Sequence, residues 1–89
     1  MNIKFTYVNA KGEKKARNVI VVHEGDGKIS GFDLKALNRS EAAKVRKVFG
    51  KKPVTPFPTV KVPMDYAAVG IPKEMFVRSY RTFNKSDIQ

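Results

Sequence analysis

The stretch that decides the fold is residues 18–33, which read NVIVVHEGDGKISGFD. Its aliphatic run, Val19–Val22, is the centre of a strand that we expect to extend from about Lys14 to His23 and to be buried on both faces. The following segment, Glu24–Gly27, contains Asp-Gly, the pair that supplies both positive-φ residues of a type I′ hairpin turn. A third strand, Lys28–Lys35, is therefore expected to return antiparallel to the second.

A first strand precedes this hairpin. Ile3, Phe5 and Tyr7 alternate with polar residues, which is the pattern of a half-buried strand. The turn after it, Asn9–Gly12, offers a glycine for a positive φ. The first part of the chain is thus predicted to consist of three strands joined by two tight turns.

A short helix is expected after the third strand. Asn38 and Glu41 have the spacing of a capping box, in which each side chain bonds the backbone amide of the other residue. Gly50 is placed to end the helix as C′. Four apolar residues share one face of this helix: Ala42, Val45, Val48 and Phe49. A helix of about residues 40–49 is too short to be stable alone, so it must pack against the rest of the domain.

The segment after the helix is rich in proline. The chain has five prolines, at Pro53, Pro56, Pro58, Pro63 and Pro72. Because proline lacks an amide donor, we expect an extended crossing or an edge strand here. Its apolar anchors would be Val54, Phe57, Val60, Val62 and Met64. A single helical turn, Lys73–Phe76 with Pro72 at N1, and a final strand, Val77–Ile88, would complete the chain.

This order of elements predicts an α+β fold that is mostly antiparallel β. We expect one small, basic domain over residues 1–89, a β-barrel or half-barrel with one inserted helix at about residues 40–49, inside an insertion of about residues 39–76. The predicted core is a single cluster of apolar residues. Its members are Phe5, Val19, Val21, Ile29, Phe32, Leu34, Val45, Phe49 and Phe83.

Several classes of function are disfavoured by composition. The chain has no cysteine, which excludes a disulfide scaffold and a thiolate metal site and fits a reducing compartment. No apolar run is long enough for a membrane span and no signal segment is visible, so we expect a protein of the cytoplasm or the nucleoid, without a membrane partner. His23 has no second ligand at a regular spacing, and the eight carboxylates are scattered. We therefore expect no enzyme activity, no catalytic residue, no metal and no cofactor.

Charge is the most informative property of the chain. There are 18 Lys and Arg residues against 8 Asp and Glu, a net charge of +10. Between residues 35 and 52 a single acid, Glu41, accompanies seven basic residues: Lys35, Arg39, Lys44, Arg46, Lys47, Lys51 and Lys52. With the apolar face of the helix buried, we expect Lys44, Arg46, Lys47 and Lys51 to point outward or to flank that face, and so to form a row of cations that binds a polyanion. The alternative interpretation is a solvated helix face.

Aromatic and basic residues alternate near the end of the chain. Residues 78–83 read RSYRTF on the predicted final strand. Arg78 and Arg81 could pair with phosphates, and Tyr80 could stack on a base, as on the sheets of small barrels that hold single strands. The alternative is that the rings belong to the core, which is favoured for Phe83 and equally weighted for Tyr80.

These residues also resemble a known family. The following elements occur in the order found in WYL domains: Tyr7, Gly12-Glu13, Arg17 with Val19, Gly31-Phe32-Asp33, and Tyr80-Arg81-Thr82-Phe83 with Ile88. The name-giving Trp-Tyr-Leu trio aligns with Gly27, Lys28 and Ile29, and the basic insertion replaces a short connection. The resemblance implies an SH3/Sm-like barrel that binds nucleic acid or a nucleotide-like ligand on a basic face, through Arg17, Arg78 and Arg81.

Two functions are therefore carried forward. The first is a nucleic-acid-binding module, for DNA or RNA, that uses the helix cations for phosphates and the final strand for base stacking. The alternative is a small interaction protein, of the kind encoded by phages and mobile elements, that docks on an acidic host protein and modulates it.

Overall fold

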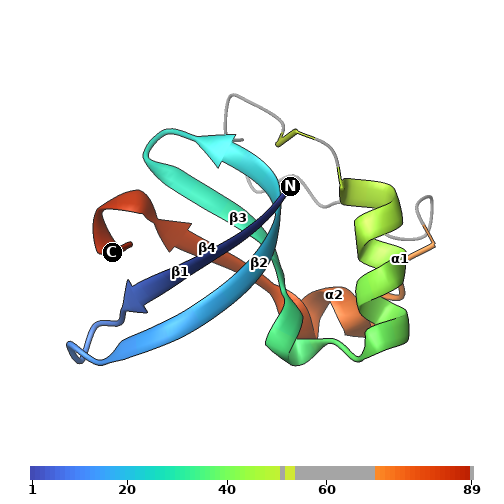
Figure 1. The fold of residues 1–89 in the computed structure, drawn as a ribbon, viewed down its shortest axis with the longest axis horizontal. Helices are drawn as coiled ribbons and strands as arrows, with labels where there is room; N and C mark the ends of the chain where they lie inside the picture. Colours follow the sequence, from blue (N-terminus) through green and yellow to red (C-terminus); the bar gives the residue numbers. More distant parts are fainter. Residues whose placement is uncertain (51, 54–69, 89) are drawn as a thin grey trace.

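The computed structural model describes residues 1–50, 52–53 and 70–88. Four strands form one antiparallel sheet in the order β1-β2-β3-β4. The strands are β1 (Asn2–Val8), β2 (Lys14–Gly25), β3 (Lys28–Asp33) and β4 (Tyr80–Asn84). The helices of the described residues are α1 (Arg39–Phe49), α2 (Lys73–Ser79) and two 3-10 turns, η1 (Leu34–Ala36) and η2 (Lys85–Asp87). Figure 1 shows α1 and α2 together on one side of the sheet.

The sheet coils until its two ends approach each other. After η2, Ile88 forms an antiparallel bridge with Tyr7 at the end of β1. The rings of Phe5 and Tyr7 meet the ring of Phe83 on β4 edge to face, with centroids 5.2 and 4.9 Å apart. The predicted α+β class, a small barrel or half-barrel of antiparallel strands, is confirmed.

The β2–β3 hairpin forms as the sequence predicts. Asp26 and Gly27 at its tip have φ values of 53° and 70°. β3 ends at Asp33, two residues before the predicted Lys35, because the Asp33 side chain accepts a hydrogen bond from the Lys35 amide at 3.0 Å. This cap begins η1 and turns the chain towards α1.

Two cores form instead of the single predicted one. On the side of the helices, one cluster, the helix-side core, contains Ile20, Val22, Phe32, Val45, Ile71 and Met75, with Leu34 and Phe49 packed against it. Inside the coiled sheet, a second cluster, the inner core, contains Val19, Val21, Ile29 and Phe83, with Ile3, Phe5, Tyr7 and Ile88. Successive strand residues point to opposite faces, so Val19–Val22 contribute to both clusters. Burial of this run on both faces is confirmed, whereas packing of all nine predicted residues together is wrong.

A glycine allows β2 and β3 to coil closely. Gly31 pairs with Val21, and a Cβ atom at Gly31 would collide with the backbone carbonyl of Ile20. Any larger residue would force the two strands apart between the two cores. The glycine therefore maintains the strong curvature of the sheet.

The helix α1 begins as predicted and ends differently. The Asn38 side chain accepts from the Glu41 amide at 2.8 Å, and the Glu41 side chain accepts from the Asn38 amide at 3.0 Å, which confirms the capping box. Gly50 ends the helix as predicted, but as its C-cap in a right-handed conformation, φ −70°, and not as C′. A glycine is needed here because the backbone of residue 50 lies close to the Arg46 carbonyl, with which a Cβ atom would collide.

The last part of the chain is more helical than predicted. α2 extends to Ser79 instead of stopping at Phe76, and Pro72 is its N-cap, not N1. Ile71, Met75 and Phe76 pack on the helix-side core, and this burial favours helix over the predicted start of the strand at Val77. β4 is correspondingly short, and Lys85–Asp87 is a 3-10 turn. Residues 54–69, which contain most of the predicted proline-rich crossing and its five anchors, Val54, Phe57, Val60, Val62 and Met64, lie outside the described residues.

Candidate nucleic-acid interface

The helix α1 carries four exposed cations. These are Arg39, Lys44, Arg46 and Lys47, and none of them forms an ion pair within the described part of the chain. Ala42 and Val45 on the opposite side are buried against the sheet. The apolar stripe thus fixes the helix, and the charged residues are left at the surface.

The single acid of α1 is neutralised from elsewhere in the fold. Glu41 accepts hydrogen bonds from the Asn38 amide and, at 2.6 Å, from the guanidinium of Arg78 on α2. The bond to the Asn38 amide and then the bond to Arg78 hold the pKa of Glu41 below its ordinary value. Glu41 is therefore bound first to the cap and to Arg78, and its remaining interaction with an α1 cation is a weaker, purely coulombic one with Lys44.

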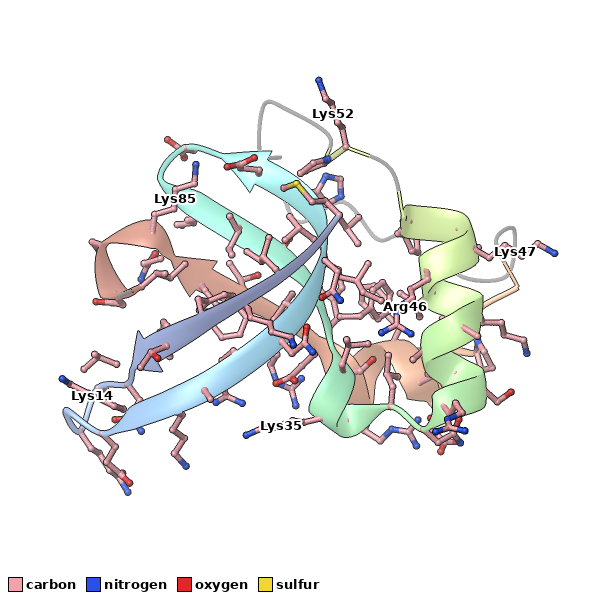
Figure 2. All side chains as sticks on the ribbon, in the orientation of Figure 1. Lys14, Lys35, Arg46, Lys47, Lys52 and Lys85 are labelled. Atoms are coloured by element: carbon pink, nitrogen blue, oxygen red, sulfur yellow. The ribbon has the colours of Figure 1, made fainter. Side chains whose placement is uncertain are left out.

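The α1 cations do not form the single row that the sequence predicts. At about 100° per residue, Lys44 and Arg46 are separated by about 160° around the helix axis. Figure 2 shows Arg46 reaching from α1 towards the sheet and Lys47 reaching away from it. Lys44 and Lys47 share one flank, and Arg39 and Arg46 share the other, because these pairs are spaced i,i+3 and i,i+7.

The two flanks of α1 face different parts of the domain. The Glu41–Arg78 pair places the flank of Lys44 on the side of α2. The amino group of Met1 donates to the Phe49 carbonyl at 3.1 Å, so β1 begins beside the last turn of α1. Arg46 therefore lies on the side of β1 and β2, in agreement with Figure 2.

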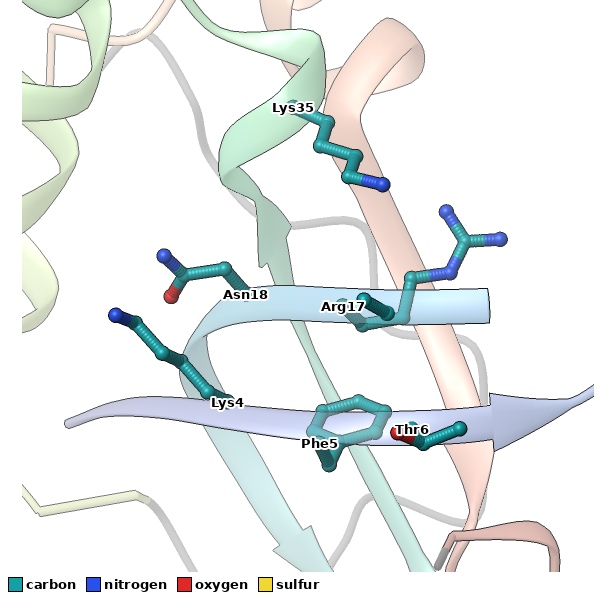
Figure 3. A pocket seen from close by; sticks show the side chains of 7 residues that line it. Lys4, Phe5, Thr6, Arg17, Asn18 and Lys35 are labelled. Atoms are coloured by element: carbon teal, nitrogen blue, oxygen red, sulfur yellow. The ribbon is translucent and has the colours of Figure 1, made fainter. Parts of the chain in front are cut away.

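An open hollow lies on the β1–β2 face beyond α1. It has a volume of about 460 Å³ and is lined by Lys4, Phe5, Thr6, Ala16, Arg17, Asn18 and Lys35. Lys4 pairs with Asn18 and Thr6 with Ala16, so these four side chains share the sheet face of Ile20, on which α1 packs. Figure 3 shows Lys4 beside Asn18, with Lys35 extending over the strand from η1. No carboxylate lines this hollow.

Sequence reasoning missed Lys4 and Asn18 as candidate site residues. In the first strand, Ile3, Phe5 and Tyr7 alternate with polar residues, so Lys4 must lie on the face opposite these apolar side chains. That alternation was the available signal for Lys4. Asn18 immediately precedes the aliphatic run of β2, and its half-buried position depends on the pairing with β1. Lys35 was predicted and is exposed above them.

The three arginines carried over from the family resemblance bond within the protein. Arg17 donates to the buried Asp33 carboxylate at 3.0 Å and lies 5.9 Å from the ring centroid of Phe83. Arg78 pairs with Glu41, and Arg81 donates to the backbone carbonyls of Tyr80 and Arg78 at 2.9 and 2.8 Å. These contacts stabilise the fold itself: Arg17 at the inner core, Arg78 between α1 and α2, and Arg81 at the start of β4.

Tyr80 packs in the helix-side core. Its ring stacks on Phe76 with centroids 4.4 Å apart and meets Phe32 edge to face. Its hydroxyl is 2.7 Å from the hydroxyl of the buried Ser30, and burial raises its pKa. Stacking on Phe76 occupies one face of the ring that the sequence had offered to a base, while Phe83 is buried as expected.

Two basic candidates follow α1 in the sequence. Lys52 is exposed beyond the end of α1, and Lys51 lies outside the described residues. Among the described residues, no three His, Cys, Asp or Glu side chains gather as metal ligands. No described helix is both long enough and apolar enough to cross a membrane.

No family model, curated protein or solved structure matches this chain. The resemblance to WYL domains therefore stays a prediction. The candidate site rests on its own geometry.

Proposed function

We propose that this protein binds nucleic acid through a basic surface formed by α1 and the adjoining β1–β2 face. One observation carries the proposal: α1 exposes Arg39, Lys44, Arg46 and Lys47 while its single acid is bound to Arg78. An ordinary solvated helix mixes charges of both signs at i,i+4 spacing, and this one does not. Repulsion among the cations is relieved when phosphates contact them and counterions are released.

The proposed partner is DNA or RNA in the cytoplasm, or the nucleoid. Phosphate contacts by exposed cations recognise the backbone and carry no sequence information by themselves. The base-stacking role of Tyr80 forms no part of this proposal, because that ring packs on Phe76. The family resemblance is consistent with the same proposal through its expected basic face.

The test is a titration of duplex DNA at several salt concentrations, for the parent and for the variant K44Q/R46Q/K47Q. Because Lys44 and Arg46 lie on opposite flanks of α1, one phosphate backbone can contact one or two of the three side chains. The slope of log K against log salt should therefore become shallower by about 0.9 to 1.8. The melting temperature should hardly change, because exposed charges contribute little to stability.

A matched control separates local contacts from net charge. The variant K11Q/K15Q/K28Q removes the same three charges from exposed positions at the turn after β1, in β2 and at the start of β3. It should keep a slope close to that of the parent. Equal slopes for the parent and the helix variant would exclude α1 as the contact surface. Absence of binding to any nucleic acid at low salt would instead favour the acidic-protein alternative.

A further inference from the structure

The hollow on the β1–β2 face contains both cations and an unsatisfied acceptor. Lys4 and Lys35 supply ammonium groups at its rim. The Asn18 Oδ1 atom is buried and has no hydrogen-bond partner within the described residues. A buried acceptor without a donor is unfavourable by itself, so a ligand that supplies the donor would be bound more tightly.

This combination narrows the chemistry of the ligand. A phosphodiester has only acceptors, so it can contact the two lysines but cannot satisfy the Asn18 oxygen. A nucleotide has acceptors and donors. Its phosphate oxygens can accept from the lysines, and a base-edge amino group or a sugar hydroxyl can donate to Asn18. A duplex keeps only the groove-facing hydrogens of its exocyclic amino groups as base donors, whereas an unpaired nucleotide also offers its Watson–Crick donors and can turn them into a hollow.

We propose that this hollow binds one unpaired nucleotide of a single strand, with Lys4 and Lys35 on its phosphates and Asn18 accepting from its base or sugar. The inference rests on the proposed function and adds to it a preference for single strands. The Arg46 flank of α1 lies on the same face of the sheet as the hollow. A strand leaving the hollow can therefore continue along that flank.

The experiment measures binding of a fluorescent twelve-nucleotide single strand and of its duplex, by anisotropy at several salt concentrations. K4Q/K35Q removes two phosphate contacts, so its slope on the single strand should be shallower by about 1.4. K11Q/K28Q removes the same charge from exposed sites outside the hollow, and it should change the slope by less than half as much. The parent should bind the single strand more tightly than the duplex at equal salt.

Asn18→Ala tests the acceptor separately from charge. It should weaken binding of the single strand by about 3- to 10-fold, the range of one neutral hydrogen bond, and leave the salt slope unchanged. Competition by inorganic polyphosphate, which offers no base or sugar, should be the same for this variant and the parent. Thermal melting of each variant checks that it is folded.

The outcomes distinguish this inference from the proposed function. If α1 variants weaken binding while K4Q/K35Q has the same salt slope as K11Q/K28Q, the hollow is not the nucleotide site. The same conclusion follows if Asn18→Ala leaves binding of the single strand unchanged, or weakens binding of the single strand and of polyphosphate equally. If poly-L-glutamate competes better than the single strand and is sensitive to Asn18→Ala, the hollow binds an acidic peptide instead. If no nucleic acid binds at low salt, both proposals fail.

Discussion

Replacement of Phe49 by alanine should weaken the packing of the basic helix on the sheet and destabilise the domain. Phe49 is half-buried in the last turn of α1, and its ring stacks on Phe32 with centroids 5.4 Å apart and planes 27° apart. A fully buried Phe→Ala change costs about 3–5 kcal/mol, and partial exposure reduces the expected loss here to about 2–3 kcal/mol. That is a large share of the stability of so small a domain.

Thermal unfolding followed by circular dichroism measures this loss. At about 4–8 °C per kcal/mol for a domain of this size, the melting temperature should fall by about 10–20 °C. Val77→Ala is the matched control, because Val77 on α2 is 64% exposed and its truncation should change stability by less than about 0.5 kcal/mol. A Phe49→Ala protein that melts with the parent would refute the docking of α1 through this residue, and with it the rigid placement of the cations.

Two further predictions concern polar contacts that join the helices to the rest of the fold. Tyr80→Phe leaves the buried Ser30 hydroxyl without its partner, so the free energy of unfolding measured with denaturant should fall by about 1–2 kcal/mol. The double variant S30A/Y80F should recover part of this loss. A Tyr80→Phe protein as stable as the parent would contradict the bond. The folded pKa of Glu41 is depressed, so its contribution to stability is present above its ordinary value of 4.5 and is lost as the pH falls through the folded value. Glu41→Gln should flatten the stability curve in that acidic range, and superimposable curves for the two proteins would argue against the Asn38 and Arg78 contacts.

Local chemistry allowed much of the fold to be predicted. Asp26-Gly27 specifies a hairpin through its own φ preferences, and Asn38 with Glu41 specifies a helix start through bonds made within four residues. Both features form where the sequence indicates. The end of α2 was placed at Phe76 because Tyr80 and Phe83 were assigned to one continuous strand, whereas Ser79 is fully buried and donates to the Met75 carbonyl one helical turn earlier.

The division of the core also depends on contacts that are distant in sequence. The period-2 pattern shows that Val19 and Ile20 face opposite sides, but it does not show what covers each side. The coiling of β1 towards Ile88 covers one side, and α1 covers the other. In the candidate site, the run of cations was evident from the sequence, whereas the Glu41–Arg78 pair joins residues 37 positions apart. The pairing of Lys4 with Asn18 likewise requires the register of β1 on β2.

The two kinds of cation have different roles in this domain. Arg17, Arg78 and Arg81 each donate to a carboxylate or a backbone carbonyl of the protein, which suits a planar group with several fixed donors. In the proposed interface, the exposed lysines of α1 and the hollow are flexible point charges that can move to a phosphate at small structural cost. Arg39 and Arg46 differ from the other arginines, because they are exposed and form no ion pair within the described part of the chain. Their shared flank, next to the hollow, is therefore where planar, bidentate recognition of a phosphate is best placed to occur.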